Sequence, residues 1–179
     1  MENYPWYGKI DSEKPLQQGE LVFSCPIVKP PVDFEKIHTD GVDIDTYNAV
    51  VISQACDLIY QKINIVQITP FVTLEAYGKK HPEFNSSTKK NIKNRNKLRD
   101  NLVIGRLLLN SCEEQTGIND YLVVDFSSTF GVDYKFLTNH VQKQKLRVCL
   151  LPPYRERLTQ FYATWIMRIG SPIDIPEFK

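Results

Sequence analysis

The side chains best suited to chemistry gather in one short polar segment, Ser53-Gln54-Ala55-Cys56-Asp57. The segment follows the apolar run 49–52, where a strand would end, and short side chains that bond nearby backbone groups favour a turn there. A cysteine beside a carboxylate could act as a thiol nucleophile if a base such as His140 lay close to it. The alternative is a turn cysteine packed under the sheet edge, within a polar segment that bonds backbone groups or contacts a ligand.

A second group of side chains is basic and lies between residues 78 and 106. Only Glu83 and Asp100 oppose its cations, which are Lys79, Lys80, Lys89, Lys90, Lys93, Arg95, Lys97, Arg99 and Arg106. A hydroxyl residue at 86–88 could cap a helix that extends to about residue 102. Basic helices often contact phosphates, and they also often form a solvated face. Because the whole chain carries a net charge of only +1, electrostatic binding would depend on this local excess.

Other classes of protein are disfavoured by the composition. The four cysteines are far apart, with no C-x-x-C pair and no close histidine, so we expect no metal site and no cofactor. An acidic stretch over 32–46 lacks the spacing of a calcium-binding loop and is expected to be a solvated loop. No apolar run approaches the ~18–20 residues of a membrane helix, and the first ten residues lack a signal-peptide pattern. We therefore expect a cytoplasmic protein without membrane contact.

Short runs rich in Val and Ile predict strands, because β-branched side chains pack well on a pleated surface. The strands are predicted at 19–28, 49–52, 63–68, 106–110, 121–126 and 146–151. Residues 1–18 are interpreted as an irregular arm, and residues 129–140 as a turn over Gly131. The chain is thus expected to form a single domain over 1–179, mainly β within the α+β class.

The last predicted element is a helix over 153–169. Pro153 suits its first turn and Gly170 its C-terminal cap. Its apolar residues recur at intervals of three and four and form one broad face. They are Leu158, Phe161, Tyr162, Trp165, Ile166 and Ile169. That face is expected to bury against the sheet or against a partner subunit, which would make the protein a homodimer.

The order of these elements resembles the MazF/PemK toxin family. A Gly-acidic pair, Gly19-Glu20, opens the first strand, A-V-V-I-S-Q lies at 49–54, and I-V-Q-I-T lies at 65–69. Members of that family are small SH3-like barrels with a C-terminal helix, usually dimeric, that cleave single-stranded RNA. The resemblance implies an SH3-like barrel with a basic helical insertion at 78–106. The tail also resembles uncharacterised bacterial proteins that pair an I-S-Q-x-C-D segment with a P-Y-R-E helix.

The resemblance implies catalytic candidates as well. In the family, an arginine before the V-V-I-S strand stabilises charge on the scissile phosphate, and a hydroxyl in the following segment positions it. Thr69 matches the hydroxyl, whereas the arginine position falls on Tyr47 or Asn48, and neither is cationic. Arg147 or Arg155 could supply the cation from elsewhere in the chain.

Without the family arginine, we expect a degenerate nuclease that acts as a binding or regulatory protein in a bacterial defence or toxin–antitoxin setting. Its partners would be a protein, as an antitoxin or regulatory subunit, and single-stranded RNA. The binding candidates are Ser53, Gln54, Cys56, Asp57, Lys89, Lys90, Lys93, Arg95, Lys97, Arg99 and Arg157. The alternative is an active, metal-independent endoribonuclease that uses Thr69 and a relocated arginine.

Overall fold

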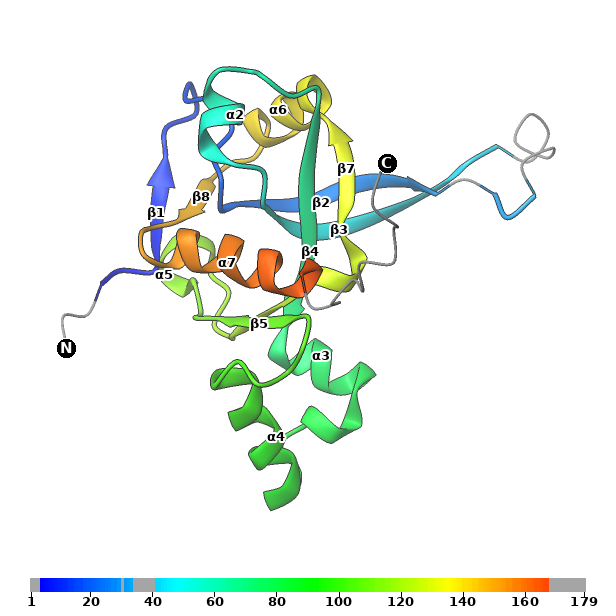
Figure 1. The fold of residues 1–179 in the computed structure, drawn as a ribbon, viewed down its shortest axis with the longest axis vertical. Helices are drawn as coiled ribbons and strands as arrows, with labels where there is room; N and C mark the ends of the chain where they lie inside the picture. The colour runs from blue at the N-terminus through cyan, green and yellow to red at the C-terminus, as the bar shows by residue number, and fades with distance from the viewer. Residues whose placement is uncertain (1–3, 30, 34–40, 168–179) are drawn as a thin grey trace, which may run out of the picture.

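A computed structural model describes residues 4–29, 31–33 and 41–167 of the chain (Figure 1). The described residues form an eight-stranded antiparallel sheet in the order β1-β8-β2-β3-β4-β6-β5, and β7 also pairs with β4. This arrangement confirms the expected α+β class, and the pairing shows that the sheet is antiparallel. The strands are β1 (Tyr7–Ile10), β2 (Glu20–Lys29), β3 (Asp43–Val51), β4 (Ile65–Thr73), β5 (Arg106–Leu109), β6 (Leu122–Asp125), β7 (Phe130–Asp133) and β8 (Arg147–Leu150).

The helices lie around this sheet and extend from one end of it (Figure 1). Helix α7 crosses in front of the strands, α6 and α2 lie near one end of them, and α3 and α4 project from the other end. The α-helices are α2 (Ala55–Ile59), α3 (Leu74–Lys80), α4 (Lys89–Arg99), α5 (Glu113–Thr116), α6 (Tyr134–Gln142) and α7 (Tyr154–Ile166). The described residues also contain two 3₁₀ turns, η2 (Pro82–Phe84) and η3 (Phe126–Ser128).

The central strands β2, β3 and β4 are buried on both faces over the segments where they meet, residues 20–22, 49–51 and 68–71. Successive side chains of a strand point to opposite faces, so neighbouring residues enter different cores. In β3, Val50 belongs to a first core, whereas Ala49 and Val51 belong to a second. This explains why these strands appear in the sequence as continuous apolar runs instead of alternating ones.

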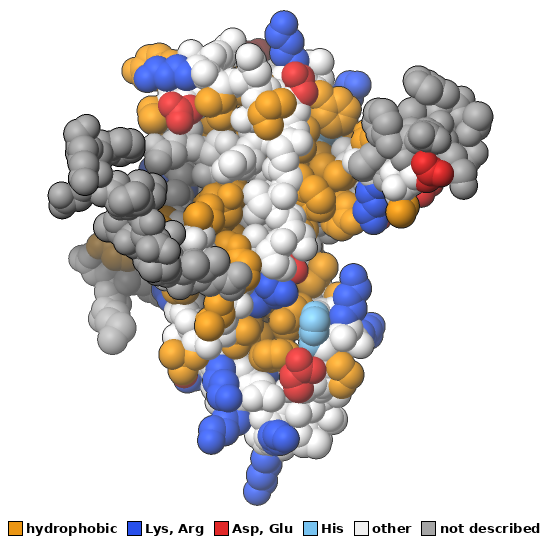
Figure 2. Space-filling view, turned by 45° about the vertical axis from the view of Figure 1, so that its right-hand side comes forward, with side chains coloured by type: hydrophobic (Ala, Val, Ile, Leu, Met, Phe, Trp, Pro, Cys, Tyr) orange, Lys and Arg blue, Asp and Glu red, His pale blue; other side chains and the backbone are white. Residues whose placement is uncertain are grey.

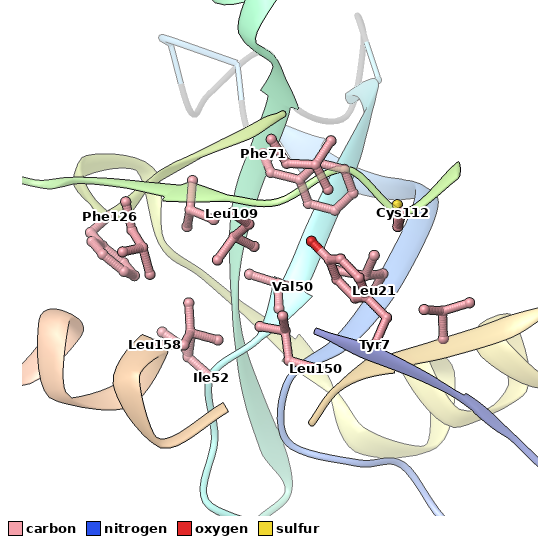
Figure 3. Close-up of a cluster of buried hydrophobic side chains, with 14 residues drawn as sticks. Tyr7, Leu21, Val50, Ile52, Phe71, Leu109, Cys112, Phe126, Leu150 and Leu158 are labelled. Atoms are coloured by element: carbon pink, nitrogen blue, oxygen red, sulfur yellow. The ribbon is translucent and has the colours of Figure 1, made fainter. Parts of the chain in front are cut away.

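Helix α7 closes the first core, as Figure 3 shows. Its Leu158 is fully buried and points toward Val50, Ile52 and Leu150 of the sheet. Phe161, Tyr162 and Trp165 are partly buried and pack against the same cluster. Most of the apolar face predicted for this helix therefore packs on the chain's own core, whereas Ile166 is exposed. The helix ends at Ile166, with Met167 at its C-cap, three residues before the predicted end; Ile169 and Gly170 lie outside the described residues.

The basic segment forms a separate helical lobe, which we define as α3, η2 and α4 (Figure 1). Thr88 caps α4 by accepting a hydrogen bond from the Asn91 N–H at 3.2 Å, which agrees with the predicted cap. Leu98 is the one buried side chain of α4 among the described residues, and it packs with Leu74 and Tyr77 of α3. The lobe thus has a small core of its own, next to the end of β4.

Several local predictions were wrong. Residues 7–10 form β1, because their backbone pairs with β8. The segment 129–140 contains β7 and the start of α6, whose Leu137 and Val141 are buried one turn apart. Part of the acidic stretch is strand, since residues 43–46 pair with β2, while residues 34–40 lie outside the described part. Among the described residues no helix has the length and apolar character needed to cross a membrane.

Candidate functional site

The first candidate site is a groove of about 630 Å³ between β3 and the helical lobe, which we call the β3–α3 groove. It forms where β4 leaves the sheet and continues into α3, so the sheet supplies one wall and the lobe the other. Figure 2 shows hydrophobic side chains gathered where the lobe meets the sheet, and Lys and Arg side chains over the outer end of the lobe. The groove therefore joins an apolar surface to a basic one.

Aromatic side chains line the β3–α3 groove on both sides. Tyr47 of β3 and Phe130 of β7 are half-buried, and their ring centroids lie 5.1 Å apart. Phe71 forms part of the floor and packs edge-on against Phe23 at 6.0 Å. On the lobe side, Tyr77 contacts the His81 ring at 4.4 Å. Phe71 and Tyr77 are buried, so the half-buried rings of Tyr47 and Phe130 are the ones that a flat ligand such as a nucleobase could reach.

The lobe supplies the lysine Lys80 and the neighbouring His81 to the groove. Lys80 and His81 follow one another at the end of α3, and both line the groove. These two residues come from the basic segment, although neither is among the binding residues predicted from the sequence. A Lys ammonium beside aromatic rings can neutralise a phosphate of a bound nucleotide.

The sheet wall of the groove contains a β-bulge. Val22 pairs with Ala49 and Cys25 pairs with Tyr47, so Phe23 and Ser24 together face the single residue Asn48. The extra residue keeps Cys25 on the same core as Val22. Ser24 has a positive φ of 49°, which is unfavourable for any residue other than glycine. Its N–H donates to the Asn48 side-chain oxygen at 3.0 Å, and both residues line the groove.

Thr69 lies beneath the groove and is fully buried. Its hydroxyl donates to the Asp125 carbonyl oxygen at 2.6 Å. The Asp125 carboxylate in turn accepts from Arg106 at 2.6 Å and from the Ser127 N–H at 2.9 Å. The Thr69 hydroxyl therefore links β4 to β6. Because it is buried, it cannot reach a ligand in the groove.

Arg147 lies in the sheet interior, on β8, whereas Thr69 lies on β4. The contacts of Arg147 are all with other parts of the chain. Its guanidinium makes a two-pronged ion pair with Glu20, at 2.7 and 2.9 Å. Its other donors bond the carbonyl oxygens of Asp11, Ser12, Lys14 and Pro15. The two charged side chains are 2% and 0% exposed. All five guanidinium donors are therefore used within the chain, and none remains for a phosphate.

The predicted polar segment lies at a different groove, of about 690 Å³, between α2 and α7. Ser53, Gln54 and Asp57 line this α2–α7 groove, together with Tyr162 and other residues of α7. The structure thus brings the I-S-Q-x-C-D segment next to the helix that begins P-Y-R-E. A turn was predicted over this segment, but its second half is helical, since α2 begins at Ala55.

The thiol site considered from the sequence does not form. Cys56 is exposed, and its sulfur lies 3.8 Å from Gln54 Oε1 and 3.7 Å from Asp57 Oδ1. His140 instead contacts the Phe23 carbonyl oxygen through Nε2 at 2.9 Å. No group of three His, Cys, Asp or Glu side chains in the described part of the chain could hold a metal ion.

The remaining candidate cations have different surroundings. Arg155 pairs with Glu156 at 2.6 Å, and Arg157 lies over the Phe161 ring at 5.6 Å. In α4, Arg95 donates to the Phe84 carbonyl oxygen at 2.6 Å, and Arg99 pairs with Asp100 at 2.9 Å. The lysines of this helix are all exposed, namely Lys89, Lys90, Lys93 and Lys97.

The catalytic candidates are therefore dispersed, and none of the predicted binding residues lines the β3–α3 groove, where aromatic side chains lie beside Lys80 and His81. Tyr47 and Asn48 were noted in the sequence only because they occupy the position where the MazF/PemK family has an arginine. Sequence reasoning missed Phe130 and His81, because nothing local indicates that β7 and α3 meet there. The sequence matches no protein-family model and no curated protein.

Proposed function

We propose that this chain is a divergent MazF/PemK-like, SH3-like barrel without a working nuclease site, and that it binds single-stranded RNA in the β3–α3 groove. The observation that carries this proposal is the union of half-buried aromatic rings with Lys80 and His81 in one groove. Single-stranded nucleic acids bind where bases stack on aromatic rings and a basic surface follows the backbone. The exposed lysines of α4 extend the basic surface beyond the groove.

The surroundings of the catalytic candidates favour binding over cleavage. A cation that stabilises a phosphoryl transition state must reach the reacting phosphate. The Arg147 donors are occupied by Glu20 and backbone carbonyls, and the Thr69 hydroxyl is buried. A regulatory role in bacterial defence or in a toxin–antitoxin pair, with an antitoxin or regulatory subunit as protein partner, belongs to the same proposal and follows from the family resemblance.

The test is a titration of a fluorescent 12-nucleotide RNA with purified protein in EDTA, read by anisotropy and followed by a gel for cleavage. We expect binding that weakens with salt, and intact RNA. Phe130→Leu removes a ring face at the groove, and Phe136→Leu is the matched control, since Phe136 is an exposed ring on α6 outside the groove. Loss of one stacked base should weaken binding by about 5-fold or more in the first variant alone.

A matched pair of lysine variants tests the electrostatic part. Lys80→Gln removes a groove cation, and Lys143→Gln removes an exposed lysine just after α6. Each phosphate contact contributes about −0.7 to the slope of log K against log salt for single strands. Lys80→Gln should make the dependence of log K on log salt less steep, and Lys143→Gln should leave it unchanged. Equal effects of the two variants, or absence of any RNA binding, would contradict the proposal, and metal-independent cleavage would favour the endoribonuclease alternative.

A further inference from the structure

We propose that an extended segment of a partner protein adds as a β-strand to the open edge of β3, within the β3–α3 groove, and presents acidic side chains to Lys80. This inference goes beyond the proposed RNA binding and does not depend on it. Where both hold, the added strand and the RNA occupy the same groove and exclude each other.

The open edge exists because β3 and β4 separate. They pair over three residues of each strand, and Ala49 opposite Pro70 is the last pair. Beyond it, β4 pairs with β6 through residues 71–73, while β3 continues along β2 as far as Asp43. Figure 1 shows β3 running to the side and β4 continuing into α3. No strand in the described part of the chain pairs with the edge of residues 43–47 that faces away from β2.

The partner of Thr46 in β2 shows which way the Thr46 backbone points. Thr46 lies opposite Pro26, and proline has no N–H to donate. Opposed residues of an antiparallel ladder alternate between pairs that exchange both hydrogen bonds and pairs that exchange none. Thr46 and Pro26 are therefore a pair without bonds, so the N–H and C=O of Thr46 point to the open edge. Among the described residues neither group has a hydrogen-bond partner.

The pattern of backbone groups on this edge matches a polypeptide. By the same alternation, the N–H and C=O of Ile44 also point away from β2. A donor and an acceptor thus recur every second residue, about 7 Å apart along the strand. An extended peptide presents the same two groups at the same spacing, which is how peptides add to exposed sheet edges. Thr46 lines the groove, so the added strand would lie between β3 and the helical lobe.

The side chains around the edge favour a strand with apolar and acidic residues. Tyr47 and Phe130 are half-buried rings that line the groove, and pairs of aromatic and β-branched side chains stabilise neighbouring strands. The carboxylate that lines the groove, Asp125, is already paired with Arg106 at 2.6 Å. No carboxylate of the described residues forms an ion pair with Lys80, which is exposed. The uncompensated charge of the groove is therefore positive.

The experiment titrates native protein into a fluorescent, capped heptapeptide of alternating valine and glutamate, read by anisotropy. We expect a dissociation constant below about 1 mM. The same peptide with its three central residues N-methylated keeps the side chains and loses the donors that pair with a strand edge, so it should not bind. A peptide with glutamine in place of glutamate should bind more weakly, and Lys80→Gln should remove the difference between the two.

Thr46→Pro tests the edge from the side of the protein. It removes the N–H that points to the groove, and proline is tolerated on an edge where no ladder bond is lost. Thr46→Ala is the matched control, because it removes the side chain and keeps the N–H. Thr46→Pro should weaken peptide binding by about fivefold or more, and Thr46→Ala should leave it unchanged. If Thr46→Pro does not fold, the N-methylated peptide decides.

The results separate this inference from the proposed function. Absence of peptide binding, equal binding of the N-methylated peptide, or equal effects of the two Thr46 variants would overturn the inference. Self-association of the native protein that Thr46→Pro abolishes would assign the edge to a second copy of the chain and would overturn it as well. Peptide binding without RNA binding would overturn the proposed function alone. Where both bind, the peptide should displace the labelled RNA, and simultaneous binding would contradict the shared groove.

Discussion

Replacement of Arg147 by Met should destabilise the fold severely. The substitution leaves the Glu20 carboxylate in a site that is 0% exposed, with the Gln17 N–H at 3.0 Å as its remaining donor among the described residues. Removing one partner of a buried ion pair costs about 3–5 kcal/mol, since the other charge stays buried without compensation. That is a large part of the ~5–15 kcal/mol by which domains are stable.

The assay is urea unfolding followed by circular dichroism. With a slope of about 2 kcal/mol per molar urea, the midpoint should fall by about 2 M. The double variant Glu20→Leu/Arg147→Met removes both charges, and it should recover at least about 2 kcal/mol of the loss, because replacing a whole buried pair with apolar groups is often close to neutral. The carbonyl oxygens released at residues 11, 12, 14 and 15 lie in exposed residues, where water can bond them.

Two results would refute this reasoning. A loss of less than about 1 kcal/mol in Arg147→Met would show that the pair does not hold the sheet together. A double variant no more stable than Arg147→Met would show that the cost does not come from an uncompensated Glu20 charge. A folded double variant that binds RNA as the native protein does is expected, since we assign Arg147 a structural role.

Three further predictions concern buried polar groups. Thr69→Val should lower the free energy of unfolding by about 0.5–1.5 kcal/mol, because one buried hydrogen bond is lost, and should leave RNA affinity unchanged; a folded variant that lost binding would restore a direct role for Thr69. Native protein at pH 8 should expose one thiol, Cys56, to a thiol reagent and four after denaturation, because the other cysteines are buried; modification of two or more native thiols would contradict this. Burial raises the pKa of the Cys149 thiol to about 12, so the folded state retains a proton that the unfolded state releases from about pH 9 upward. The melting temperature should therefore fall as pH rises above 9, and Cys149→Ala should reduce that fall.

The sequence was informative where one element carries its own signal. The β-branched runs placed β2, β4, β6 and β8, and the hydroxyl residues at 86–88 included the Thr88 cap of α4. Helix α6 was missed although Asp133 caps it by accepting the Phe136 N–H at 2.9 Å. Its stripe of Leu137 and Val141 is only one turn long, and the neighbouring Gly131 favoured a turn.

Features made by distant residues were not accessible in the same way. Glu20 and Arg147 are 127 positions apart, and each begins an apolar strand. A charged residue in such a position needs a buried partner, but the sequence does not say which one. The β3–α3 groove depends on a bulge in β2 and on β7 lying beside β4, and neither feature has a local signature.

Ultraviolet crosslinking of a single-stranded RNA to the native protein, with the crosslinked peptides identified by mass spectrometry, tests the proposed binding site most directly. We expect crosslinks at Tyr47, Phe130 or Tyr77, the rings that line the β3–α3 groove, and their loss when unlabelled RNA competes. Crosslinks confined to α7 or to the polar segment 53–57 would contradict the proposed site and would move RNA binding to the α2–α7 groove.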